Sequence, residues 1–104
     1  MMNNPVQIYT ASLSGSKGAV IKGKEISQAE AVLRRKKGLD VVVCGSNLAL
    51  NRRIAGEIER EANGTVKRCP PHPSAGSRSL PHYQPDPRPP AGHTFYETPN
   101  RQAV

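Results

Sequence analysis

Residues 39–69 read LDVVVCGSNLALNRRIAGEIEREANGTVKRC and predict a strand, a helix and a second strand. The first strand covers the apolar run from Leu39 to Cys44, which only Asp40 interrupts. Such a run is typical of a strand that is buried on both faces. Strand–helix–strand units usually have parallel strands joined by a right-handed crossover, so we expect that arrangement, with an antiparallel return as the alternative.

The helix of this unit begins after Gly45, with Ser46 or Asn47 as its N-cap, and ends at Asn63–Gly64. The N–H groups at a helix N-terminus attract anions, so the Gly45 turn is a candidate phosphate-binding element. A tight connection with a polar cap is the simpler explanation of the same residues. Three apolar residues of the helix recur at a spacing of four: Leu50, Ile54 and Ile58.

Upstream, Ser27 and Glu30 have the spacing of a capping box, and Gly38 follows a basic stretch. This pattern predicts a helix over residues 28–37. The first 19 residues carry weaker signals, with a short strand near Ile8 and a Ser/Gly-rich stretch after it. We therefore expect a loosely ordered N-terminal segment.

Downstream, the composition changes at Cys69, because nine of the ten prolines and all three histidines lie after it. Proline fixes the backbone and removes an N–H donor, so residues 70–91 contain too many prolines for a helix or a central strand. Residues 93–97 have high β propensity and predict a closing strand.

Together these segments predict one α+β or small α/β domain over residues 1–104. Two helices pack on a sheet of about four strands, followed by a long Pro-rich loop and the closing strand. Residues 20–69 form the helix–strand–helix–strand scaffold, and residues 70–104 are the candidate active-site segment.

The chain is strongly basic, with 15 Lys and Arg against 8 Asp and Glu and a net charge of +7. This charge attracts phosphate backbones, anionic membranes or an acidic protein, and nucleic acid is our first choice. Solubility alone is the competing explanation for the high net charge.

No apolar run is long enough to span a membrane, and no signal peptide is recognisable. The two cysteines form no metal-type pair, and we expect them at strand ends.

The histidines are the natural general acids and bases, because their unperturbed pKa is closest to neutral pH. We predict His82 and His93 as the acid and base of a metal-independent ribonuclease, and Arg88 as the cation that holds the phosphate. Other side chains able to bind the substrate are Lys67, Arg68, Arg78, Tyr83, Thr94, Tyr96 and His72.

Metal binding is a second use of the same histidines, with Asp86 or Glu97 as further ligands. The histidine spacing of ten and then eleven residues fits no helical or zinc-knuckle pattern. Few acidic residues are available for a magnesium-dependent nuclease. We therefore expect no metal and no other cofactor.

Several short strings add a resemblance: HPSAG at 72–76, LPHYQP at 80–85, RPP at 88–90 and GHTFYE at 92–97, with DVVVCG at 40–45 and Asn51–Arg52 before them. Over roughly residues 20–100 the chain resembles the C-terminal toxin domains of bacterial polymorphic toxins, of the Rhs and contact-dependent-inhibition types. The chain lacks the tight His-His or His-Asn arrangement of HNH nucleases, which puts cleavage of DNA in doubt.

The resemblance implies a toxin ribonuclease that acts in the cytoplasm of a target bacterium. It also implies RNA as the substrate, a larger carrier polypeptide for delivery and an acidic cognate immunity protein. Three alternatives stay open: a metal-dependent nuclease acting on DNA, a non-catalytic nucleic-acid- or protein-binding module, and a toxin enzyme that uses NAD or another nucleotide through the Gly45 turn.

Overall fold

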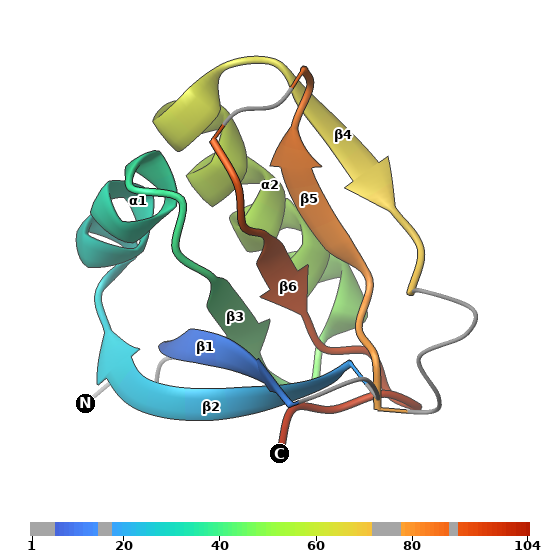
Figure 1. Ribbon diagram of the computed structural model, residues 1–104. Helices are drawn as coiled ribbons and strands as arrows, with labels where there is room; N and C mark the ends of the chain where they lie inside the picture. Colours follow the sequence, from blue (N-terminus) through green and yellow to red (C-terminus); the bar gives the residue numbers. More distant parts are fainter. Residues whose placement is uncertain (1–5, 15–17, 72–77, 88–89) are drawn as a thin grey trace, which may run out of the picture.

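The computed structural model describes residues 6–14, 18–71, 78–87 and 90–104. Two helices pack on a mixed six-stranded sheet (Figure 1), so the predicted α+β class is confirmed, with more strands than the expected four. In chain order the elements are β1 (Gln7–Ser14), β2 (Ala19–Ile26), α1 (Gln28–Lys36), β3 (Val41–Cys44), α2 (Leu48–Asn63), β4 (Val66–Cys69), β5 (His82–Pro85) and β6 (Thr94–Tyr96).

The strands lie in the order β2-β1-β3-β6-β5-β4. β3 and β6 are parallel, and every other neighbouring pair is antiparallel. β4 therefore runs in the same direction as β3, as the strand–helix–strand pattern predicted. The two strands are not neighbours, however, because β6 and β5, which come later in the chain, lie between them.

β3 is the most buried strand, and Val41, Val42 and Val43 have no exposed surface. It pairs with β1 on one side and β6 on the other, and both of its faces are covered. This environment explains the uninterrupted β-branched run, because neither face requires polar residues.

Both helices begin where their caps predict. Ser27 and Glu30 form the complete capping box at the start of α1. The Asn47 side chain accepts a hydrogen bond from the Leu50 N–H at 3.0 Å at the start of α2. At the other end of α2, Gly64 has a φ of +79°, a value that glycine adopts readily.

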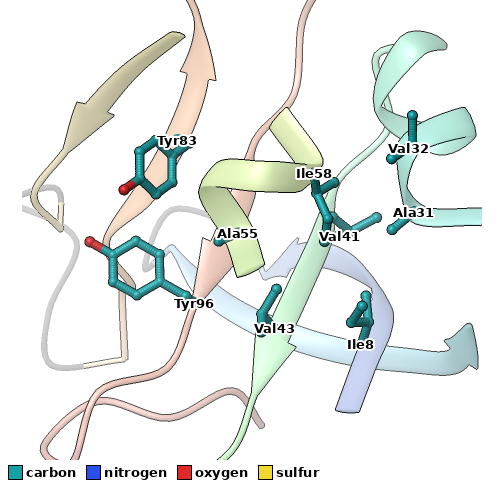
Figure 2. Packing of buried hydrophobic residues seen from close by; sticks show 9 residues of the cluster. All are labelled: Ile8, Ala31, Val32, Val41, Val43, Ala55, Ile58, Tyr83 and Tyr96. Atoms are coloured by element: carbon teal, nitrogen blue, oxygen red, sulfur yellow. The ribbon is translucent and has the colours of Figure 1, made fainter. Parts of the chain in front are cut away.

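The main core lies between the helices and one face of the sheet (Figure 2). Its buried residues are Ile8, Ala31, Val32, Val41, Val43, Ala55, Ile58, Tyr83 and Tyr96. A second core covers the opposite face, and its buried residues are Ala11, Val20, Val42, Cys44, Leu80 and Phe95. Both faces of the central strands are therefore shielded from water.

A buried ion pair joins α1 to α2 within the main core region. Arg35 Nε donates to Glu59 Oε1 at 2.8 Å, and both side chains are fully buried. Arg35 Nη1 also donates to the carbonyl oxygens of Leu39 and Ala91. Gly92 lies against this guanidinium with a φ of +91°, and a Cβ there would collide with Arg35 Nη1 and Gly38 O.

Two predictions about elements need correction. The expected short strand near Ile8 is present as β1, but it forms an antiparallel hairpin with residues 19–26, where a loosely ordered segment and the start of the scaffold were expected. Within the Pro-rich stretch, residues 82–85 form the interior strand β5, between β4 and β6. Pro85 is tolerated because it is the last residue of the strand.

Candidate functional site

The two predicted catalytic histidines lie together on the face of the sheet opposite the helices. His82 starts β5 and is paired with Phe95 of β6. His93 directly precedes β6, and alternation along the strand places it on the same face as Phe95. The His82 and His93 ring centroids are 4.7 Å apart at 79°. Phe95 packs against both rings, at 5.5 Å from His82 and 4.9 Å from His93.

Asp40 joins this group through the parallel pairing of β3 and β6. Val41 is paired with Thr94, so the residues that precede them, Asp40 and His93, also lie side by side. Asp40 Oδ1 lies 3.1 Å from His93 Nδ1 and accepts the His93 backbone N–H at 2.7 Å. Their side chains are 21% and 18% exposed, so the pair is accessible at the surface.

His82 is less accessible than His93. It has no exposed surface, and its Nδ1 lies 3.4 Å from the Leu80 carbonyl oxygen. In this conformation a substrate therefore reaches the His93 edge of the pair and not His82. We call Asp40, His82 and His93 the histidine cluster.

The remaining predicted residues fall into four groups. Arg88 and His72 lie outside the described residues. Lys67 and Arg78 are exposed. Tyr83 and Thr94 are buried in the interior: Arg60 lies over the Tyr83 ring, and the Thr94 hydroxyl donates to Glu59 Oε1 at 2.9 Å. These two residues support the core and present almost no surface for stacking a base.

The other two predicted residues, Arg68 and Tyr96, line a pocket of about 330 Å³ together with Arg52. We call it the arginine pocket. The sequence analysis did not single out Arg52, although helix phase could have identified it. Arg52 lies four residues after Leu48 and three before the buried Ala55, on the side of α2 that faces the sheet.

Burial raises the pKa of the Tyr96 hydroxyl above its ordinary value. The positive charges of Arg52 and Arg68 and a side-chain hydrogen bond with Arg52 oppose this effect. The hydroxyl therefore stays protonated at neutral pH. Tyr96 enters the pocket as a neutral polar group beside two cations.

At the Gly45 turn, one of the protein's own side chains forms the hydrogen bond that a bound anion would need. The Gly45 N–H donates to Glu97 Oε1 at 3.2 Å, and Asn51 Nδ2 donates to the carbonyl oxygens of Gly45 and Glu97. A carboxylate thus takes the position that a bound anion would need at this N–H. Burial, and then the charge of Glu97, raises the pKa of the adjacent Cys44 thiol to about 12, so the thiol stays protonated at neutral pH.

Within the described part of the chain, no group of three or more His, Cys, Asp and Glu side chains has the arrangement of a metal site. In the same ranges, no helix has the length and apolar character of a membrane span. The chain matches no protein-family model, curated protein or solved structure in our comparisons.

Proposed function

We propose that the protein is a toxin ribonuclease that cleaves RNA without a metal ion, with His93 as the general base. The observation that carries the proposal is the Asp40–His93 pair, at 3.1 Å and accessible at the surface. A carboxylate that contacts Nδ1 orients an imidazole so that Nε2 exchanges protons with a substrate. The net charge of +7 supports binding of RNA through its phosphates.

In the proposed reaction, His93 accepts the proton of a ribose 2′-hydroxyl. The 2′-oxygen forms a bond to phosphorus, and the bond between phosphorus and the 5′-oxygen breaks. The leaving oxygen takes a proton from solvent, which gives a 2′,3′-cyclic phosphate and a 5′-hydroxyl. Arg88 keeps its expected role as the cation near the phosphate, although it lies outside the described residues.

The burial of His82 gives it a positioning role in this proposal. Its ring packs against the His93 ring at 4.7 Å and limits the orientations that His93 can adopt. His82 was expected to be one of two histidines that transfer a proton directly. The proposal keeps His93 as the general base and assigns the other proton transfer to solvent. Delivery by a larger carrier, action in a target-cell cytoplasm and neutralisation by an acidic immunity protein complete the proposal.

The test is incubation of the purified protein with total RNA and with plasmid DNA, each with and without EDTA. We expect cleavage of RNA that EDTA does not prevent. His93→Ala should lower the rate by about 10²–10⁴-fold, the usual contribution of a general base. Asp40→Asn should also lower it, because an amide still accepts the His93 N–H but orients the imidazole poorly. Arg53→Gln, a change on the exposed face of α2, is the control.

RNA cleavage that survives at the wild-type rate in His93→Ala, with native circular dichroism, would contradict the proposal. The second candidate function is a non-catalytic nucleic-acid-binding module. It is favoured by the arginine pocket, because neither histidine is among the residues that line it. RNA that stays intact, with binding that weakens as salt increases, would select this second function.

A further inference from the structure

The arginine pocket opens at the edge of the sheet where β3, β4 and β6 all end. These three strands run in the same direction, so their carboxyl ends meet there. Open sheets of α/β proteins bind ligands at this edge. The walls come from the start of α2, the ends of β4 and β6 and the residue before β5: Leu48, Arg52, Arg68, Cys69, Pro70, Pro81, Tyr96 and Thr98.

The charge of the pocket is entirely positive among these lining residues. Arg52 and Arg68 contribute two guanidinium groups, and no Asp or Glu is present. Within the described ranges neither arginine forms an ion pair. Two other arginines differ: Arg35 is neutralised by Glu59 at 2.8 Å, and Arg53 lies 3.9 Å from Glu57.

Arg52 also carries a donor that lacks an acceptor. Its Nε atom is buried and has no hydrogen-bond partner among the residues that the structure describes. A buried donor without an acceptor is unfavourable, and it is more so on a charged group. Because Arg52 lines the pocket, a reorientation of its side chain would let an anion there supply the acceptor that this nitrogen lacks.

We propose that the arginine pocket binds a phosphate group of RNA, through the guanidinium groups of Arg52 and Arg68 and the hydroxyl of Tyr96. A planar guanidinium matches a phosphate because two parallel N–H groups can donate to two of its oxygens. The volume of about 330 Å³ is at the lower end of the range for small-ligand sites, roughly 300–1,000 Å³. The inference rests on the proposed function, since it takes RNA as the ligand, and it places a phosphate-binding site at the end of β6, away from His93, which precedes that strand.

The test uses uridine 3′-monophosphate and uridine as probes and measures binding by isothermal titration calorimetry at constant salt. We expect the wild-type protein to bind the nucleotide and not the nucleoside, because the pocket recognises the phosphate. Arg52→Gln and Arg68→Gln should each weaken nucleotide binding at least tenfold. Arg53→Gln removes the same charge from the neighbouring, 68% exposed position, and it should change binding less than twofold.

Circular dichroism and the urea midpoint of each variant establish that it is folded. Absence of nucleotide binding by the wild-type protein would overturn the proposal. Equal losses in Arg52→Gln and Arg53→Gln would also overturn it, because net charge alone would then explain the binding. The cleavage assay with His93→Ala is a separate readout. The pocket and the catalytic proposal can therefore fail independently.

Discussion

Arg35 and Glu59 place two charges in the interior, and the surrounding hydrogen bonds show how the structure accommodates them. Glu59 accepts hydrogen bonds from Arg35, Thr94 and Asn63, and Arg35 also donates to two backbone carbonyls. The charges are therefore paired and almost fully hydrogen-bonded. This network links α1, α2, β6 and the segment that leads to His93.

Removal of one partner of this pair should be strongly destabilising. We expect Arg35→Met to lower the free energy of unfolding by about 3–5 kcal/mol, because Glu59 would remain buried without a cation. The double variant Arg35→Met/Glu59→Met should recover part of the loss, since no unpaired charge remains. Urea denaturation measures both effects.

The surface pair offers the control for this prediction. Arg53→Met disrupts the contact with Glu57, and exposed pairs of this kind contribute about 0–1 kcal/mol. An Arg35→Met protein as stable as the Arg53→Met protein would show that the buried network contributes little.

At the residue scale, part of the site could be predicted from the sequence. The sequence analysis assigned His82 and His93 to one site, because it took the last third of the chain as the candidate active-site segment. Asp40 stood out as the only residue that interrupts an apolar run. The sequence does not reveal that Asp40 contacts His93, because this contact depends on the parallel register of β3 and β6. The burial of His82 likewise depends on tertiary packing.

Among the elements, the capping box of α1 gives the clearest energetic prediction. The Ser27 side chain accepts the Glu30 N–H at 3.1 Å, and Glu30 Oε1 accepts the Ser27 N–H at 3.0 Å. Ser27→Ala should lower the free energy of unfolding by about 1 kcal/mol, measured by urea denaturation. Ser46→Ala is the control, because Ser46 is exposed and Asn47 is the cap of α2.

The same motif predicts a dependence on pH. The hydrogen bonds from the Ser27 backbone and side chain lower the pKa of the Glu30 carboxyl below its ordinary value. The ionised carboxylate therefore stabilises the fold above the unfolded-state pKa, and this contribution is lost as the pH falls through the folded-state pKa. A stability difference between wild type and Glu30→Gln that persists unchanged under strongly acidic conditions would contradict this assignment.

Elements with strong local sequence signals could be predicted. Strands whose formation depends on pairing with distant segments of the chain were missed. Caps and a buried valine run identified α1, α2 and β3. β2 was missed because five of its eight residues are exposed and its apolar residues do not alternate with polar ones, so it lacks the pattern that indicates a half-buried strand. β5 was missed because prolines 81 and 85 mark its ends, while its pairing partners lie elsewhere in the chain.

For the molecule as a whole, residues 102–104 close the second core. The Val104 N–H donates to the Val20 carbonyl oxygen at 2.8 Å, and the Lys22 N–H donates to the Val104 carbonyl oxygen at 3.0 Å. The Ala103 N–H donates to Glu97 Oε2 at 2.8 Å, and its side chain packs on the second core. These contacts hold the hairpin and β6 together.

Deletion of residues 102–104 should therefore destabilise the fold. The three hydrogen bonds named above, at about 1 kcal/mol each, suggest a loss of about 3 kcal/mol in the free energy of unfolding; the exposed bond from Gln102 Nε2 to the Pro99 carbonyl oxygen is also lost and should add little. A thermal unfolding curve and binding of a hydrophobic dye would report the loss and the uncovered core. Gln102→Ala, at an exposed position, should leave both unchanged. An unaltered melting temperature after the deletion would refute this role of the terminal residues.

The parallel pairing of β3 with β6 has a consequence for the order in which a ribosome makes the chain. Val41 emerges long before its partner Thr94, so the nascent valine strand keeps one unpaired edge until almost the entire domain has been translated. Asp40 is likewise synthesised well before His93. An interrupted translation product that ends before residue 93 therefore contains Asp40 without His93, and it cannot form the contact between them.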